Sequence, residues 1–148
     1  NPYLIHEDLQ KNMQYNVGII RTKKEIQYGI NRIEDMKLQF QKVKAPGSSQ
    51  FNPGWHEALA LRNLLISSES VARAALLREE SRGAHTREDF PSERDEWLEY
   101  NIINKKGANG EMQTIKVKRS EPDKELKRIA NSPIEDLEKE VIIDHNKL

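Results

Sequence analysis

Apolar and polar residues follow each other with the period of an α-helix over the first forty positions. From Pro2 to Asn16, apolar side chains return every three to four residues, which predicts a first amphipathic helix. Thr22 followed by Glu25 is a capping-box pattern, and it predicts that a second helix begins there. The apolar positions after it extend this second helix as far as Val43.

The most apolar part of the chain runs from Trp55 to about Ser81 without glycine or proline. Residues 44–54, rich in proline, glycine and serine, form a predicted loop between this run and the second helix. Apolar residues on several faces of the run predict a third helix that is buried on more than one side. The expected fold class is mainly α, an up-down three-helix bundle that resembles a spectrin repeat.

The period changes from helical to alternating after Pro91. "EWLEYNII" and "MQTIKVK" alternate roughly by two, and the segment between them contains Gly107 and Gly110. This arrangement predicts a short β-hairpin. We therefore expect the bundle to occupy residues 1–91 and a hairpin extension to occupy residues 92–120.

Residues 121–148 are mostly charged and predict a tail with one short helix. Ser132 suits the N-cap of that helix and Pro133 its first helical position. Its apolar residues need a docking surface that the sequence does not identify; they are Ile134, Leu137 and Val141.

Composition narrows the classes of partner. Lysine plus arginine and aspartate plus glutamate each number 24, so no overall positive field attracts nucleic acid or an anionic membrane. The absence of cysteine excludes disulfides, a thiolate nucleophile and cysteine-ligated metals. No run reaches the roughly 20 apolar residues of a membrane span, and the first residues do not resemble a signal peptide. We expect a soluble protein of a reducing compartment, and Asn1 in place of methionine predicts a processed chain or a piece of a longer one.

Motifs of known chemistry are absent from the sequence. There is no glycine-rich phosphate loop, no G-x-S-x-G elbow and no H-E-x-x-H. The histidines are too scattered for metal ligation, which favours surface or interface hydrogen bonds; they are His6, His56, His85 and His145. Arg62, Glu69 and Arg73 share one helical stripe, and a solvated stripe is favoured over a buried ion-pair ladder. Trp55 is interpreted as a plug for the open end of the bundle rather than a ligand platform.

The stretch "REESRGAHTREDFP" follows the apolar run and is the strongest candidate site. Gly83 suits the left-handed residue beyond a helix end. Helix termination does not explain why His85, Arg87 and Asp89 arrive together. A polar surface that docks against another domain is favoured over a solvated loop and over catalysis, because arginine and histidine hydrogen-bond across interfaces in fixed geometries.

The same stretch resembles the C-terminal region of the flavoprotein subunit of succinate dehydrogenase and fumarate reductase. In that family a long helix ends in S-R-G-x-H-x-R-x-D-[FY]-P. The matching residues are Ser81, Arg82, Gly83, His85, Arg87, Asp89, Phe90 and Pro91. The resemblance covers roughly residues 1 to 120 and is shared with L-aspartate oxidase. The longer tail after Pro91 is more similar to the respiratory enzyme.

The resemblance implies a parent enzyme that moves a hydride between succinate or fumarate and covalently bound FAD. It would then pass electrons to an iron–sulfur subunit and to quinone, at the cytoplasmic face of the membrane. The family holds its FAD and its catalytic groups in upstream domains, so no catalytic, cofactor-binding or metal residue is assigned here. The resemblance implies a three-helix domain packed on the flavin-binding domain, with an interface formed by Arg82, His85, Arg87 and Asp89. The alternatives are a domain of L-aspartate oxidase and a stand-alone helical adaptor.

Overall fold

The computed structural model of the protein describes residues 1–48 and 50–145, which fall into two compact units. The first unit runs from Asn1 to Lys118 and contains the long helices and a β-hairpin. The second begins at Arg119 and, as far as the chain is described, consists of two helices. The predicted fold class, a mainly α bundle followed by a hairpin and a charged tail, is confirmed.

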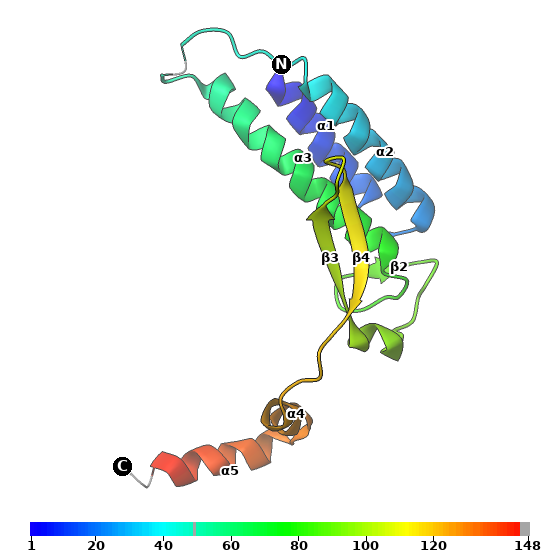
Figure 1. Cartoon of the computed structure of the whole chain (residues 1–148), viewed down its shortest axis with the longest axis vertical. Helices are drawn as coiled ribbons and strands as arrows, with labels where there is room; N and C mark the ends of the chain where they lie inside the picture. The colour runs from blue at the N-terminus through cyan, green and yellow to red at the C-terminus, as the bar shows by residue number, and fades with distance from the viewer. Residues whose placement is uncertain (49, 146–148) are drawn as a thin grey trace. The chain divides into compact units, whose positions relative to one another are not determined.

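An up-down bundle is formed by α1 (Pro2–Asn16), α2 (Lys23–Phe40) and α3 (Pro53–Leu77), as Figure 1 shows. The capping box predicted for the second helix is present. The Thr22 side chain accepts a hydrogen bond from the Glu25 N–H, and the Glu25 carboxylate accepts one from the Thr22 N–H at 2.7 Å. Both residues satisfy backbone donors that the first helical turn leaves without partners.

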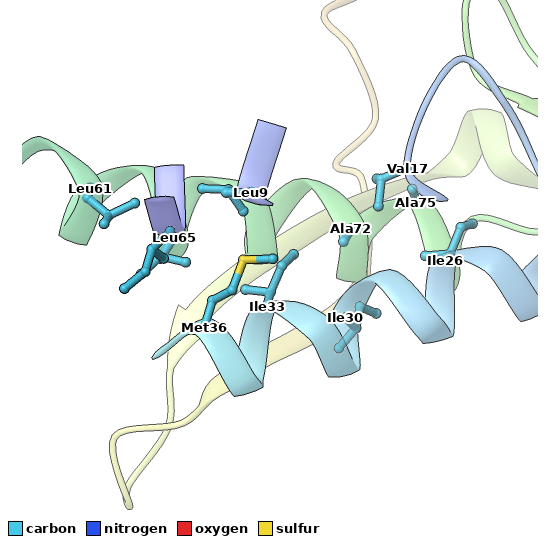
Figure 2. Packing of buried hydrophobic residues seen from close by; sticks show 11 residues of the cluster. Leu9, Val17, Ile26, Ile30, Ile33, Met36, Leu61, Leu65, Ala72 and Ala75 are labelled. Atoms are coloured by element: carbon cyan, nitrogen blue, oxygen red, sulfur yellow. The ribbon is translucent and has the colours of Figure 1, made fainter. Parts of the chain in front are cut away.

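The hydrophobic core lies where the three helices meet, and Figure 2 shows its side chains interdigitating between α2 and α3. Each buried leucine or isoleucine contributes about 1.5–3 kcal/mol relative to an exposed one. The core consists of Ile5, Leu9, Val17, Ile26, Ile30, Ile33, Met36, Leu61, Leu65, Ala72 and Ala75.

The prediction that the third helix is buried on more than one side is wrong. Its fully buried residues form a single stripe, whereas Leu59, Ile66 and Val71 are each about half exposed, at 48%, 48% and 52%. In a bundle of three helices, each helix faces its two neighbours along one broad face, and the hairpin covers only part of the rest of α3. Trp55 is 40% exposed, so it does not plug the bundle end.

The stripe that contains Glu69 also differs from the favoured prediction. Glu69 is 3% exposed, and its carboxylate pairs with Lys37 and with Arg73, whose Nε lies 2.7 Å away. Arg73 also reaches Glu34 on α2 at 2.7 Å. Glu69 is therefore the buried member of an ion-pair cluster between α2 and α3, while Arg62 stays exposed outside it.

At Gly29, helix α2 packs closely against the end of α1. A Cβ atom at this position would lie 2.9 Å from Cγ2 of Val17 and 3.2 Å from Cβ of Asn16. The Asn12 side chain also donates to the Gly29 carbonyl across the same contact, at 2.9 Å. Val17 is itself buried and β-branched, so it cannot move aside without disturbing the core.

Gly29→Ala is expected to lower the free energy of unfolding by about 1–3 kcal/mol, because the added methyl overpacks this contact. That loss outweighs the roughly 1 kcal/mol by which alanine is favoured over glycine inside a helix. Chemical denaturation measures the change. Gly54→Ala is the matched control, since a Cβ there meets only Asn52 Oδ1 at 3.4 Å, and its stability should stay level or rise. Equal stability of the two variants would contradict the expectation.

The hairpin is formed by β3 (Tyr100–Lys106) and β4 (Met112–Lys118), which pair antiparallel with Ile103 opposite Ile115. It is tied to α3 through Asn104, whose amide donates to the Ser70 carbonyl at 3.0 Å and to its hydroxyl at 2.7 Å. The hairpin around Gly107 and Gly110 is confirmed.

The strand predicted from Glu96 starts later than expected. Asp95–Glu99 is a short 3₁₀-helix, η1, because Trp97 turns inward and is buried to 5% exposure. Lys116 lies over the ring of Trp97 at 4.0 Å from its centroid. One buried aromatic residue therefore overrides the alternating pattern of this segment.

The second unit contains α4 (Lys124–Asn131) and α5 (Ile134–His145). Helix α4 was not predicted; Asp123 caps its start by accepting a hydrogen bond from the Glu125 N–H at 2.8 Å. Ser132 ends α4, since its hydroxyl donates to the Arg128 carbonyl at 2.8 Å. Ile134 is 70% exposed, while Val141 lies outside the residues whose side chains are described.

Candidate functional site

The chain leaves α3 four residues earlier than predicted. The helix ends at Leu77, and Arg78 is already extended, with φ −80° and ψ 103°. Gly83 does have a positive φ of 58°, but it lies in a tight turn in which Arg82 and His85 exchange backbone hydrogen bonds of 2.9 and 3.1 Å. Its conformation therefore serves a two-residue turn. The prediction that Gly83 terminates the helix is wrong.

Arg87 closes the end of α3 from ten residues further along the chain. Its side chain is completely buried, and its Nη1 donates to the carbonyls of Ala75, Leu76 and Arg78 at 3.0, 3.1 and 3.2 Å. These are carbonyls that a helix end leaves without intrahelical donors. A positive charge at this end also opposes the negative pole of the helix dipole.

Asp89 holds the other edge of the same guanidinium. Its carboxylate accepts from Nε and Nη2 of Arg87 at 2.8 and 2.7 Å, which is a bidentate pair. These bonds hold the pKa of Asp89 at about 2, below its usual 3.8. Asp89 also accepts from the N–H of Lys23 at 3.2 Å, in the first turn of α2. The pair therefore joins the end of one helix to the start of another.

Glu80 forms a second buried centre in the loop. Its carboxylate accepts from Nε of Arg78 at 2.8 Å, from Nη2 of Arg82 at 3.2 Å and from the N–H of Arg94 at 2.9 Å. Burial would raise the pKa of Glu80, but these hydrogen bonds outweigh burial and lower it to about 2. A completely buried carboxylate is tolerated because each of its oxygens has a charged or backbone donor.

Two short strands bring the connection between α1 and α2 against this loop. β1 (Ile20–Arg21) pairs in parallel with β2 (Thr86–Arg87). Arg21 Nη2 lies 2.6 Å from Nδ1 of His85, whose Nε2 lies 3.2 Å from the Arg78 carbonyl. Burial lowers the pKa of His85, and the neighbouring arginines lower it further. The neutral imidazole fits both contacts, with Nε2–H donating and Nδ1 accepting.

Comparison with known proteins assigns the chain to a family. The family model described as "Fumarate reductase flavoprotein C-term" matches residues 6–133. The chain belongs to this family. The resemblance inferred from the S-R-G-x-H motif is therefore confirmed.

Relatives of this flavoprotein family match most of the chain. The fumarate reductase (CoM/CoB) of Methanothermobacter marburgensis contains a polypeptide that is 38% identical over 71% of the chain and 19% of its own length. The succinate dehydrogenase flavoprotein subunit of Coxiella burnetii is 34% identical over 72% of the chain and 19% of its own length. The solved structure of Mycobacterium smegmatis Sdh1 in complex with UQ1 superposes with a TM-score of 0.75, at 39% identity, over 82% of this chain and 20% of that one. The chain thus spans about a fifth of the length of these relatives.

The flavoprotein motif is brought together as one cluster, but its residues differ in what they offer to a partner. Arg87 has no exposed surface, so it can serve an interface only by holding the loop in shape. Arg82 and His85 are half-buried, and Asp89 is exposed apart from its contacts with Arg87 and with the Lys23 N–H. In the part of the chain that the structure describes, no three acidic or histidine side chains are grouped to hold a metal. Nor is any helix there long and apolar enough to cross a membrane.

Sequence reasoning missed two parts of this cluster. The sequence places Glu80 only within a charged helix end, although it is the buried centre of the loop. Arg21 and the residues before it belong to a segment that the pattern marks only as a break between helices. Ile19 and Ile20 are each 64% exposed beside Arg21, and two adjacent isoleucines in a connection were the one available signal.

Proposed function

We propose that the chain is the C-terminal helical domain of an FAD-dependent flavoprotein subunit that interconverts succinate and fumarate. The observation that carries this proposal is the family match over residues 6–133. The names of the relatives, a fumarate reductase and a succinate dehydrogenase flavoprotein subunit, support the substrate class. Electrons would pass from the flavin to an iron–sulfur subunit and then to quinone.

FAD would be held by the rest of the parent protein and not by this chain. A dinucleotide-binding fold needs a parallel sheet with helical crossovers and a glycine-rich first turn. Among the described residues, parallel pairing is limited to the two-residue strands β1 and β2. The parent would lie at the cytoplasmic face of the membrane through its partner subunits, without direct insertion of this chain and without nucleic acid.

Within that parent, this chain would be a structural domain whose charged loop docks on the upstream flavin-binding domain. Arg82 and His85 are the proposed contacts, since both are half-buried and lie on either side of a tight turn. Arg87 would position that turn from inside the domain, and the exposed Asp89 would hold Arg87 from the surface and contribute to the interface. Arg82 pairs with Glu80, and Arg87 pairs with Asp89. Because these charged groups already have partners within the chain, a structural role is favoured over a catalytic one.

Purification of the full-length parent tests the enzymatic part of the proposal. We expect bound FAD and turnover of succinate or fumarate by the parent, and neither by the 148-residue chain alone. Turnover of L-aspartate instead would identify an L-aspartate oxidase. A parent without flavin would contradict the proposal and favour a helical adaptor.

Hydrogen exchange followed by mass spectrometry tests the interface. Amides of residues 18–22 and 82–86 should exchange more slowly in the full-length parent than in this chain alone, because docking protects them. Arg82→Ala should remove most of this protection in the parent while changing exchange in the isolated chain much less. Arg62→Ala, at an exposed position on α3, should leave the protection in the parent unchanged. Equal exchange in the parent and the chain would overturn the interface.

A further inference from the structure

Arg21 is a half-buried cation that has no ion pair among the described residues. Its Nη1 donates to the carbonyls of Val17 and Gly18 at 2.8 and 2.7 Å, and its Nη2 contacts His85. All three acceptors are uncharged, and the buried Nε has no acceptor in the described part of the chain. Burial lowers the pKa of Arg21, and the like charge of Arg87 lowers it further, although a guanidinium stays protonated in proteins.

The other buried or half-buried arginines of the loop are all neutralised. Arg78 and Arg82 share the carboxylate of Glu80, and Arg87 has Asp89. Arg21 lies in the same cluster, yet only neutral groups accept its hydrogen bonds among the described residues. The missing feature at Arg21 is therefore a carboxylate.

The surface beside Arg21 is apolar and open. Ile19 and Ile20 precede it directly, and each is 64% exposed. Covering them would remove apolar area from water, which favours association. A partner that also covers the adjacent Arg21 would desolvate its guanidinium, and a fully buried cation without a counter-ion is strongly unfavourable. Such a partner is favoured if it brings a negative charge to Arg21.

We infer that the surface formed by Ile19, Ile20, Arg21 and His85, the Arg21 patch, docks against a carboxylate set among apolar side chains on the parent's flavin-binding part. The inference rests on the proposed function and adds the chemistry of the facing surface. In one relative the 105 matched residues are only 19% of the length, which leaves ample further polypeptide to supply that surface. The carboxylate would accept a hydrogen bond from Nη2 of Arg21, which contacts His85 among the described residues and carries a second N–H.

A pair of variants at Ile20 tests the sign of the facing charge in the full-length parent. Ile20→Glu and Ile20→Lys add side chains of similar length and opposite charge at a position that contributes little to the core. We expect Ile20→Glu to speed amide hydrogen exchange at residues 82–86 by at least about tenfold, because the new glutamate would repel the facing carboxylate. Ile20→Lys should retain most of the protection. The melting temperatures of both variants in the 148-residue chain, which has its own core, should agree and so exclude a folding defect.

Ile20→Lys also provides a chemical probe. A zero-length carbodiimide couples an amine only to a carboxylate in contact with it, so the new lysine should form an amide to an aspartate or glutamate outside this chain. Mass spectrometry of the cross-linked peptides identifies that residue. Lys105 on β3, an exposed native lysine, is the control and should not couple to the same peptide.

The outcomes separate this inference from the proposed function. Equal loss of protection by Ile20→Glu and Ile20→Lys, or a larger loss by Ile20→Lys, would overturn the facing carboxylate while leaving the interface in place. Coupling of the new lysine only to carboxylates of this chain would overturn it as well. If the unmodified parent shows no protection at residues 82–86, the interface itself fails, and the inference fails with it.

Discussion

Arg87→Met is expected to lower the free energy of unfolding by about 3–5 kcal/mol, the cost of leaving one partner of a buried ion pair alone. The change removes the donor to three carbonyls at the end of α3 and leaves Asp89 without its bidentate partner. Domains of this size are stable by only about 5–15 kcal/mol, so a large fraction would be lost. Urea denaturation followed by circular dichroism measures it.

Two comparisons make the Arg87 result specific. Arg62→Met removes an exposed arginine from α3, the helix whose end Arg87 contacts, and should change the free energy of unfolding by less than about 0.5 kcal/mol. The double variant Arg87→Met/Asp89→Asn should be less destabilised than the sum of its single variants, because the pair acts as one unit. If Arg87→Met were as stable as Arg62→Met, the guanidinium would not hold the helix end.

Glu80→Gln is expected to lower the free energy of unfolding at neutral pH by about 3 kcal/mol, from roughly 1.4 kcal/mol per unit of pKa shift. The pKa of Glu80 is lowered from 4.5 to about 2 in the folded chain. The unfolded chain therefore binds a proton before the folded chain does as the pH falls. The contribution of Glu80 is complete above pH 4.5 and is lost progressively as the pH falls toward 2.

The pH dependence of stability distinguishes Glu80 from its neighbour. Glu79→Gln changes an exposed carboxylate one residue away and should keep both the stability and the acid sensitivity of the original chain. Glu80→Gln should unfold at lower urea concentration at pH 7 and lose less stability between pH 4.5 and 2. An unchanged pH profile in Glu80→Gln would contradict the assignment of Glu80 as the buried centre of the loop.

Local patterns predicted most of the elements because their causes are local. The capping box of Thr22 and Glu25 satisfies donors within one turn, and the hairpin around Gly110 follows from a φ of 84° that glycine adopts readily. The motif from Ser81 to Pro91 also indicated the family without any coordinates. These signals lie within a few residues of what they control.

The candidate site was predicted only in part because its contacts join distant residues. Arg87 was singled out as an interface residue, but its bonds to the carbonyls of α3 span up to 12 residues of sequence. Arg21 was not singled out, since its contact with His85 is 64 residues away in sequence. Hydrophobic periodicity carries no information on which distant polar groups meet.

The sequence by itself determined the three bundle helices, the hairpin and the family, because propensity, capping and turn chemistry act between near neighbours. The tertiary structure alone decided where α3 ends, which face of it is buried, and that Gly83 belongs to a turn. It also decided that Glu80 is a buried carboxylate and that no carboxylate pairs with Arg21 among the described residues. These features depend on desolvation and long-range pairing, and a charge gains its partner or lacks it only when the whole chain has folded.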